Sequence, residues 1–226
     1  MKIFLLSFVT LLCFIVENTI GQKGQADSVR REQIRMRWNK SLVHDTAYTF
    51  SKEANMLLQE TIMDLPSGKA LDVAMGQGRN ALFLASRGWE VTGFDLADEA
   101  VNYAKEKAKA NNLKITTSIS DMETYDYGTD KWDLITWIYG GCLEVDQIAE
   151  KIKTSLKSGG LFLFEFFHRD AGLAMGRPEF GCETDAIKNK FIKVGGFTII
   201  RYEEKTGIAD YSLQPYKLIY FVARKN

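Results

Sequence analysis

Hydrophobic residues along the chain fall into short continuous runs and helical stripes that follow one another. Residues 70–74 form an apolar run interrupted only by Asp72, residues 80–87 carry a helical stripe, and residues 90–95 form a second run. Strand-like runs that alternate with helical stripes are typical of parallel βαβ units. The pattern therefore predicts an α/β fold that begins near residue 70.

The same alternation continues toward the carboxyl end of the chain. Further strands are expected at residues 114–120, 132–137, 161–167, 197–205 and 216–224, and further helices at residues 51–63, 98–111, 146–156 and 185–194. The run at 161–167 is continuous, as in a strand buried on both faces. Ser51 is the expected N-cap of the 51–63 helix. Residues 171–184, which contain several glycines, are expected to form a long loop with little secondary structure.

Length and charge limit the classes of protein that are possible. A chain of 226 residues is long enough for one α/β domain of ordinary size. The formal net charge is +0, and no long basic run occurs. Nucleic acid and an anionic membrane surface are therefore not evident partners.

The first residues have the pattern of an export signal. Lys2 gives a positive start, residues 3–16 are almost all apolar, and small residues precede Gln22. This is the pattern of a secretory signal peptide, and the apolar run is short for a membrane-spanning helix. The expected organisation is a signal peptide at 1–21, a lead and lid segment at 22–50, and one domain at 51–226. Export to the periplasm or outside the cell is expected, without stable membrane insertion after cleavage; an uncleaved anchor is the alternative.

Cysteine and histidine are few. Removal of residues 1–21 leaves Cys142 and Cys182, which either pair in an oxidising compartment or remain two free thiols. No Cys-x-x-Cys or Cys/His spacing of a metal site occurs, and His44 and His168 are the two histidines. No metal centre is expected.

A glycine turn follows the first strand. Gly76 and Gly78 allow a sharp turn that brings a ligand against bare backbone amides, and the helix after the turn directs unpaired N–H groups toward that ligand. Asp95 ends the second strand, where 95 − 72 = 23 positions separate it from Asp72. An acid at this place can accept hydrogen bonds from both hydroxyls of a ribose.

The charge of Asp72 distinguishes two cofactors. The run from Gly76 to Ala81 also satisfies the dinucleotide pattern G-x-G-x-x-G/A. A dinucleotide places its pyrophosphate at this turn, and the carboxylate of Asp72 would repel it. S-adenosylmethionine has a ribose, an ammonium and a sulfonium but no phosphate. The sequence therefore favours S-adenosylmethionine; the alternative is a tight turn with an incidental acid.

Residues 70–108, ALDVAMGQGRNALFLASRGWEVTGFDLADEAVNYAKEKA, resemble the first motif and the following segment of class I S-adenosylmethionine-dependent methyltransferases. The run from GQGRNA through ASRGWEVTGFD is most similar to small-molecule methyltransferases of the tellurite-resistance and thiopurine-methyltransferase-like type. The resemblance covers about residues 38–224 and is specific in the first half. It implies a three-layer, Rossmann-like, seven-stranded sheet that is mostly parallel, with the last strand antiparallel.

The resemblance also implies positions for the cofactor. Asp121 and Met122 match the place where the family reads the adenine, with an acid on its amino group and an apolar side chain against its ring. The expected cofactor-binding set is Asp72, Ala74, Gly76, Gly78, Asn80, Asp95, Leu96, Asp121, Met122 and Trp137.

Residues at the carboxyl ends of later strands are candidates for the acceptor side of the site. Tyr139, after the strand at 132–137, is the first candidate for catalysis. His168 is a second candidate, as a general base, and its alternative is a loop histidine without a chemical role. Arg169 can hold an anionic substrate. By analogy with the lids of methyltransferases, Trp38 and Tyr48 are expected to line the site, or else they pack on the domain surface.

The expected function is methyl transfer from S-adenosylmethionine to a small nucleophile. The Asn/Asp-Pro-Pro-Tyr/Phe signature used on amino groups of bases is absent after the fourth strand. Two alternatives stay open. A nicotinamide-dependent oxidoreductase would use the same turn, and Tyr103 and Lys107 have a Tyr-x-x-x-Lys spacing, although on a helix. A binding protein that retains the cofactor pocket without the reaction is the other.

Overall fold

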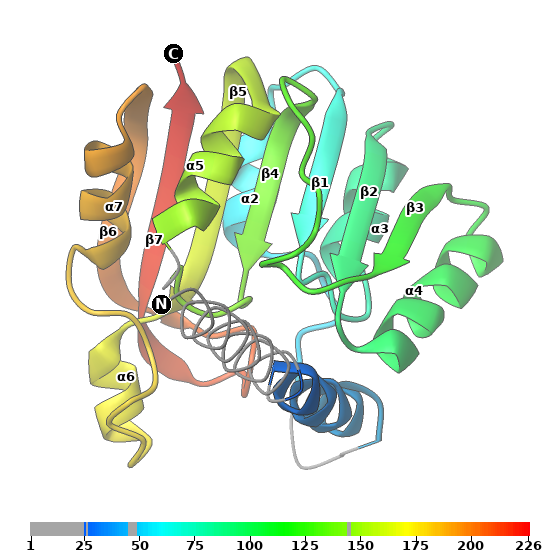
Figure 1. Ribbon diagram of the computed structural model, residues 1–226, viewed down its shortest axis with the longest axis horizontal. Helices are drawn as coiled ribbons and strands as arrows, with labels where there is room; N and C mark the ends of the chain where they lie inside the picture. Colours follow the sequence, from blue (N-terminus) through cyan, green and yellow to red (C-terminus); the bar gives the residue numbers. More distant parts are fainter. Residues whose placement is uncertain (1–24, 26, 45–48, 144–145) are drawn as a thin grey trace, which may run out of the picture.

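The computed structural model describes residues 25, 27–44, 49–143 and 146–226. Its centre is a seven-stranded sheet with the order β3-β2-β1-β4-β5-β7-β6 (Figure 1). The strands are β1 (Lys69–Val73), β2 (Glu90–Asp95), β3 (Ile115–Ile119), β4 (Trp132–Ile138), β5 (Leu156–Phe167), β6 (Phe197–Ile208) and β7 (Pro215–Lys225). All seven expected strands are present.

Strand directions confirm the expected mixed sheet. β1 pairs in parallel with β2 and β4, β2 with β3, and β4 with β5. β7 lies between β5 and β6 and is antiparallel to both. The order of the strands reverses between β1 and β4, and a ligand crevice is expected at the carboxyl ends of strands that flank such a point.

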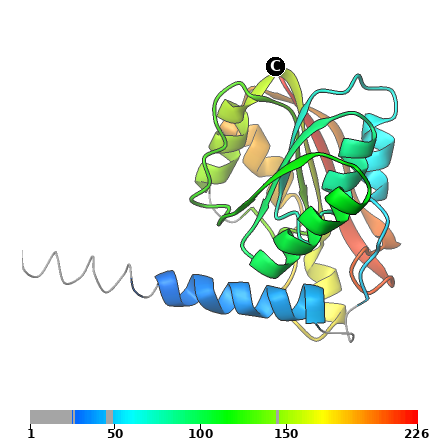
Figure 2. The same cartoon turned by 90° about the vertical axis from the view of Figure 1, so that its right-hand side faces the viewer.

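Helices form a layer on each face of the sheet. The helices are α2 (Met56–Ile62), α3 (Arg79–Ser86), α4 (Asp98–Ala110), α5 (Asp146–Ser155), α6 (Arg169–Ala174) and α7 (Ala186–Val194). Figure 2, a view rotated by 90°, shows α5 and α7 on one side of the sheet and α2 and α3 on the other. With both faces covered, β4 and β5 are buried along most of their lengths, as their apolar sequences require.

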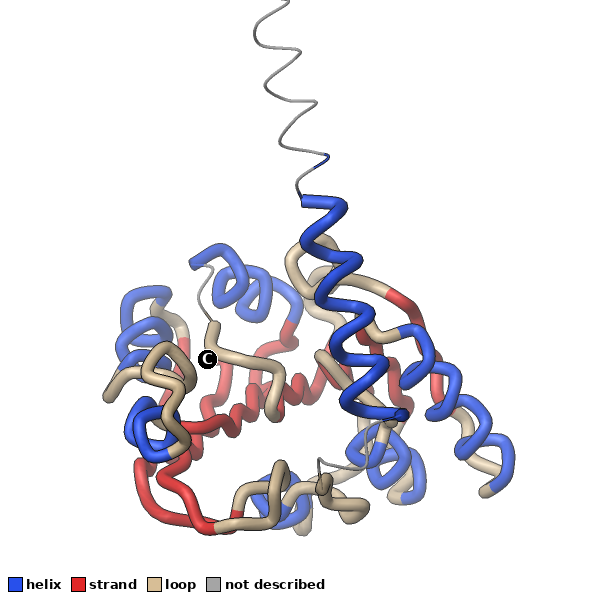
Figure 3. The backbone as a smooth tube through the Cα atoms, turned by 90° about the horizontal axis from the view of Figure 1, so that it is seen from below, coloured by secondary structure: helices blue, strands red, loops and turns tan. Residues whose placement is uncertain are grey.

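The N-terminal helix, residues 27–39, lies below the edge at which β1, β2 and β4 end (Figures 1 and 2). Figure 3, viewed from that edge, shows this helix in front of the strand ends. It continues into the π-helical turn η1 (Lys40–His44). Asn39 Nδ2 and Arg35 Nη1 donate to Oδ1 of Asp98, at the start of α4, over 2.7 and 2.6 Å. These bonds hold the helix against the domain. They also lower the pKa of Asp98, and the bond from Asn39 has the larger effect.

The helix predicted at residues 51–63 is shorter than expected. α2 begins at Met56, and its N-cap is Asn55, whose side chain accepts a hydrogen bond from the N–H of Leu58. Ser51 is not the cap; its N–H donates to the carbonyl of Asp210 over 2.8 Å. Pairing of this segment with the turn between β6 and β7 therefore overrides the local helical pattern.

The loop predicted at residues 171–184 contains a helix. α6 begins at Arg169, and the side chain of His168 caps it by accepting from the N–H of Asp170 over 3.0 Å. A histidine cap is unusual among N-caps, which explains why the sequence did not indicate a helix start here. Among the described residues no helix is long and apolar enough to cross a membrane.

Candidate cofactor and acceptor site

The glycine turn after β1 has the conformation that the sequence predicted. Gly76 and Gly78 have φ values of 54° and 77°, in the left-handed region that glycine adopts without strain. A Cβ on Gly78 would lie 2.8 Å from Cβ of Ala104, so this glycine also allows α3 to approach α4. α3 begins immediately after the turn, at Arg79. The turn thus presents bare backbone and a helix N-terminus at the crevice.

Asp95 lies at the tip of β2, beside this turn. Its Oδ2 accepts from the N–H of Gly76 over 2.9 Å, and its Oδ1 accepts from the N–H of Ala97 over 2.8 Å. Burial raises the pKa of Asp95, against the opposing effect of these backbone bonds. The two bonds fix both oxygens, and their remaining lone pairs are available to the hydroxyls of a ribose.

Asp72 is buried in β1, with 1% of its surface exposed. Its Oδ1 accepts from the Thr136 hydroxyl over 2.7 Å, whereas its Oδ2 has no hydrogen-bond partner among the described residues. Burial raises the pKa of Asp72 to about 6. A buried carboxylate oxygen without a partner is costly unless a ligand compensates it. A cationic ligand such as S-adenosylmethionine fits this requirement, and a pyrophosphate does not.

A cavity of about 690 Å³ opens at the carboxyl ends of the strands. One part of its wall contains residues expected to bind the cofactor: Ala74, Gly76, Asp95, Leu96, Asp121 and Met122. The N-terminal helix closes another side through positions that share one helical face, among them Arg31, Ile34 and Trp38. The structure thus places Trp38 in the cavity wall. Tyr48 lies outside the described residues.

Four residues of the expected cofactor set do not line this cavity. Asp72 is buried behind its wall, where it accepts from Thr136. Gly78 packs against Ala104, as described above. The side-chain oxygen of Asn80 accepts from the N–H of Asn55 over 2.9 Å. Trp137 is fully buried, and its Nε1 donates to the carbonyl of Gly141 over 3.0 Å. The contacts of Gly78, Asn80 and Trp137 shape the turn and the loop after β4, and they favour supporting roles for these residues.

Aromatic rings form the other end of the cavity wall. The rings in the lining, besides Phe94, are Trp38, Phe50, Tyr139, Phe166, Phe167, Phe180, Tyr211 and Tyr216. Tyr139 and Tyr211 stack with centroids 4.7 Å apart, and Phe50 meets Tyr211 edge-on at 4.6 Å. Such a wall excludes water and offers flat apolar surface to an acceptor.

Tyr139 belongs to this aromatic wall and is 3% exposed. It follows β4 with a φ of 58°, an unusual value for a residue with a Cβ. Its hydroxyl oxygen accepts a hydrogen bond from the N–H of Asp210 over 3.1 Å. Burial, followed by the charge of Glu165, raises the pKa of Tyr139 far above its usual value. Tyr139 therefore remains a neutral phenol with a fixed orientation.

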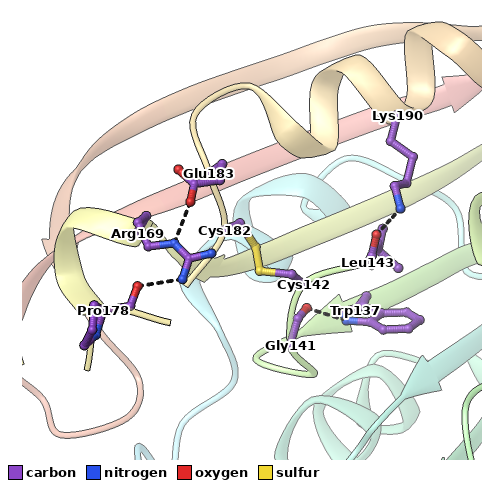
Figure 4. Close-up of a disulfide and its surroundings, with 9 residues drawn as sticks. All are labelled: Trp137, Gly141, Cys142, Leu143, Arg169, Pro178, Cys182, Glu183 and Lys190. Carbon is purple, nitrogen blue, oxygen red and sulfur yellow. Dashed lines mark hydrogen bonds and ion pairs between the residues drawn. A yellow bond between two sulfur atoms is a disulfide. The ribbon is translucent and has the colours of Figure 1, made fainter. Parts of the chain in front are cut away.

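A disulfide between Cys142 and Cys182 joins the loop after β4 to the segment after α6 (Figure 4). Cys142 and the neighbours Gly141 and Gly181 line the cavity. Arg169 does not line it: its guanidinium donates to Glu183 and to the carbonyl of Pro178, each over 2.7 Å (Figure 4). The disulfide and Arg169 together fasten the loop that forms this wall.

His168 lies behind the wall rather than in it. Its ring is 3% exposed, Nδ1 accepts from the N–H of Asp170, and Nε2 bonds the Thr184 hydroxyl over 2.8 Å. Nε2 also lies 3.3 Å from the Glu204 carboxylate. With both ring nitrogens engaged, the geometry favours a structural role, which was the alternative reading of this residue.

Several residues of the site have no local sequence signal. Phe50, Tyr211 and Tyr216 come from segments that meet only in the tertiary structure, through the bridge between Phe50 and Tyr211. Glu165 does have a signal: it is the one acid in the run LFLFEFF of β5. A charged residue inside a strand buried on both faces requires a specific partner.

Comparisons with known proteins agree with this geometry. Residues 70–160 match the family model described as a methyltransferase domain. A probable S-adenosyl-L-methionine-dependent methyltransferase, TehB, from Haemophilus influenzae is 33% identical over 89 residues, which are 34% of this chain and 31% of that protein. The ubiquinone/menaquinone biosynthesis C-methyltransferase UbiE from Geotalea daltonii is 31% identical over 109 residues, 45% of this chain and 46% of UbiE. These matches span less than half the length of either relative.

The fold is also similar to that of TehB. The crystal structure of TehB from Haemophilus influenzae superposes with a TM-score of 0.63 at 21% identity, covering 75% of this chain and 61% of TehB. Residues 70–160 thus match a methyltransferase domain, and the fold of the chain is similar to that of TehB. TehB is also similar to this chain in sequence, over 89 residues. The cofactor that the matches and the site support is S-adenosylmethionine.

Proposed function

We propose that this protein transfers the methyl group of S-adenosylmethionine to a nucleophilic atom of a small molecule. The observation that carries the proposal is the arrangement of Asp72 and Asp95 on either side of a bare-backbone turn. One carboxylate compensates a cation, and the other accepts from a ribose. Together the two acids favour binding of a nucleoside that is positively charged and carries no phosphate.

The cavity supports a small acceptor. Its volume of about 690 Å³ is within the range of pockets for small molecules, and it must contain the cofactor and the acceptor together. The sulfonium of the cofactor supplies an already activated methyl group. The chain has to hold the acceptor in line with that group and exclude water, which the aromatic wall and the N-terminal helix accomplish.

The oxidoreductase alternative finds little support. Tyr103 is 40% exposed on α4, and the Lys107 ammonium lies over its ring at 5.3 Å. Neither residue lines the cavity. A Tyr-x-x-x-Lys pair on the outside of the domain cannot deliver a proton beside a nicotinamide in the crevice.

Calorimetry and product analysis test the proposal. The full chain is titrated with S-adenosylmethionine, S-adenosylhomocysteine and NAD. It is then incubated with S-adenosylmethionine and a panel of thiols, phenols, amines and metalloid oxyanions, and S-adenosylhomocysteine is quantified by mass spectrometry. We expect binding of the first two ligands and turnover with at least one acceptor. Binding of NAD alone supports the oxidoreductase, and cofactor binding without turnover supports the non-catalytic alternative.

Export is part of the same proposal. The signal pattern lies in residues 1–21, outside the described part of the chain, and the disulfide is typical of oxidising compartments. A fusion of residues 1–30 to alkaline phosphatase, which is active only after export, tests this in a bacterial host. An active fusion with a new N-terminus at Gln22 supports cleavage and export. An inactive fusion contradicts export, and an active fusion of full length supports an anchor.

A further inference from the structure

The disulfide between Cys142 and Cys182 lies on the acceptor side of the cavity, and the proposed function gives it no role. Cys142 lines the cavity, whereas Cys182 is buried, with 2% of its surface exposed. The residues that precede them in the chain, Gly141 and Gly181, line the cavity as well. One end of the bond is therefore a residue of the cavity wall, and the other is anchored directly behind it.

The bond joins two segments of the wall that are far apart in the sequence. Residues 139–143, the β4 loop, follow β4, and residues 175–183, the α6 loop, follow α6; the sequence separation of the two cysteines is 40. Figure 4 shows the disulfide between them. Within the described part of the chain, no hydrogen bond or ion pair joins the β4 loop to the α6 loop. The disulfide is thus the bond that sets the distance between these two parts of the wall.

The α6 loop has further bonds to the domain. The N–H of Cys182 donates to the carbonyl of Phe167 at the end of β5 over 2.9 Å, and the carbonyl of Cys182 accepts from the N–H of Arg169 over 2.8 Å. A Cβ on Gly172 would lie 2.0 Å from the carbonyl oxygen of Phe180, so this loop lies directly against α6. The α6 loop should therefore keep its place when the disulfide is absent.

The β4 loop is held less firmly. Its far end, Leu143, is buried, and the carbonyl of Gly141 accepts from Nε1 of Trp137 over 3.0 Å. No atom lies within 4 Å of the position that a Cβ of Gly141 would occupy, so nothing packs against this side of the backbone. Two consecutive glycines, Gly140 and Gly141, also have a wide choice of conformations. Loss of the disulfide should therefore release residues 140–142, all of which line the cavity.

The cofactor side of the site is held by other contacts. Asp95 accepts from the N–H groups of Gly76 and Ala97, and these bonds connect the glycine turn, the tip of β2 and the start of α4. Neither the β4 loop nor the α6 loop takes part in them. The acceptor for the ribose should therefore stay in position whether the two cysteines are oxidised or reduced.

We propose that the Cys142–Cys182 disulfide positions the acceptor wall, so that its redox state controls binding of the methyl acceptor and leaves binding of the cofactor unchanged. The proposal rests on the proposed function. On oxidation the two thiols give two electrons and two protons to a disulfide-bearing oxidant, which becomes a dithiol, and the S–S bond forms. A dithiol reductant reverses this exchange. The two cysteines take no part in the methyl transfer itself.

Two consequences follow from this coupling. If the oxidised form binds the acceptor more tightly by some factor, bound acceptor must favour the disulfide over the dithiol by the same factor. In addition, thiols are kept reduced in the cytoplasm and form disulfides in oxidising compartments. With the proposed export, the acceptor site would be completed only after the chain has left the cytoplasm, which confines methyl transfer to the outer compartment.

Kinetics and binding on the oxidised and reduced full chain test the proposal. A phosphine reduces the protein, and a phenol or amine from the panel serves as acceptor, because a thiol would exchange with the disulfide. The KM for this acceptor, kcat, and the Kd for S-adenosylhomocysteine are measured in both forms. Cys142→Ser/Cys182→Ser reproduces the reduced form permanently. Ile62→Ala is the control for stability: Ile62 is buried in α2 and does not line the cavity, and the disulfide remains intact.

We expect reduction to raise the KM for the acceptor by about 5–150-fold, with the Kd for S-adenosylhomocysteine within about threefold. The double variant should have the raised KM and should not respond to the phosphine. Ile62→Ala should keep the KM of the oxidised wild type. In buffers of reduced and oxidised dithiothreitol, with S-adenosylhomocysteine bound, the midpoint of thiol labelling should move to more reducing conditions when the phenol or amine is added.

Three results would overturn the proposal. They are an unchanged KM in the reduced protein, a Kd for S-adenosylhomocysteine that rises as much as the KM, and an equal rise of the KM in oxidised Ile62→Ala. The second would mean that the whole domain loosens, and the third that lower stability alone weakens acceptor binding. A midpoint of thiol labelling that the acceptor does not move would likewise contradict the coupling.

If the wild-type protein binds the cofactor but methylates nothing in the panel, the proposed function fails instead. Hydrogen–deuterium exchange of the complex with S-adenosylhomocysteine then decides the role of the disulfide by itself. Faster exchange in residues 140–143 on reduction, with unchanged exchange in residues 76–97, supports a disulfide that positions the wall. Unchanged exchange in residues 140–143, or faster exchange throughout the domain, refutes it.

Discussion

The backbone N–H of Gly76 donates to Oδ2 of Asp95 over 2.9 Å, and this bond joins the glycine turn to the tip of β2. The two residues are separated by a helix in the sequence, yet they form adjacent parts of one ligand site. Through this bond the turn and the carboxylate keep a fixed relative position before any cofactor binds. Preorganisation of this kind reduces the cost of binding.

Asp95→Ala should weaken binding of S-adenosylmethionine by about 1–3 kcal/mol, because the ribose loses its acceptor and the Gly76 N–H loses its partner. Isothermal titration calorimetry measures the loss. Asp95→Asn retains one acceptor oxygen, so its affinity for S-adenosylmethionine should lie between those of the wild type and Asp95→Ala. Equal affinity of wild type and Asp95→Ala would contradict the assignment of Asp95 to the ribose.

Asp72→Asn should stabilise the protein and weaken its affinity for the cofactor. Burial raises the pKa of Asp72 to about 6 in the folded state, above the ordinary value of an aspartate side chain. The folded state therefore binds the proton more tightly, and the free energy of unfolding falls by up to about 3 kcal/mol as the pH rises from about 4 to 6. Urea denaturation at several pH values measures this dependence.

In Asp72→Asn, the free energy of unfolding should no longer show this decrease between about pH 4 and pH 6. Cofactor affinity of the wild-type protein should rise over the same pH range, because the carboxylate attracts a cation, and the variant should lack this rise. A variant that is less stable than wild type at pH 7 would show that the Oδ2 oxygen is compensated in the free protein.

Tyr139→Phe should reduce turnover by more than it reduces cofactor affinity. The substitution retains the aromatic wall and its stacking on Tyr211 and removes the hydroxyl that accepts from the N–H of Asp210. Steady-state kinetics and calorimetry on the same preparation separate the two effects. If cofactor affinity falls and kcat does not, Tyr139 does not belong to the acceptor side.

His168→Ala should destabilise the protein by about 0.5–2 kcal/mol, because α6 loses its N-cap. His168→Asn keeps a capping side chain and should recover most of this loss. Turnover of the two variants, measured at a temperature where both are folded, should remain close to that of wild type. A general base at this position would instead make both variants inactive.

Reduction of the Cys142–Cys182 disulfide should lower the free energy of unfolding by about 2–4 kcal/mol, since it closes a segment with a sequence separation of 40. Guanidinium denaturation with and without a phosphine reductant measures the difference. The double variant Cys142→Ser/Cys182→Ser should have the stability of the reduced protein and should not respond to the reductant. A wild-type protein without such a response would contain two free thiols.

The βαβ unit was predictable from the sequence because its signals are local. The strand at residues 70–74, the turn at Gly76 and Gly78, and Asp95 at the end of β2 follow one another within one supersecondary unit, and each has a mechanism that acts over a few residues. The helix start at Ser51 was wrong for the opposite reason. That segment is held by a turn about 160 positions further along the chain, through the bond from Ser51 to Asp210.

The sequence alone determined the order of strands and helices, the glycine turn and the two acids that define the class of cofactor, because backbone conformation and charge at these positions depend on neighbours in the chain. Only the tertiary structure decided the acceptor side. Tyr139, Glu165 and Tyr211 come from three separate segments, and their pKa values and orientations depend on burial and on contacts that exist only in the folded sheet.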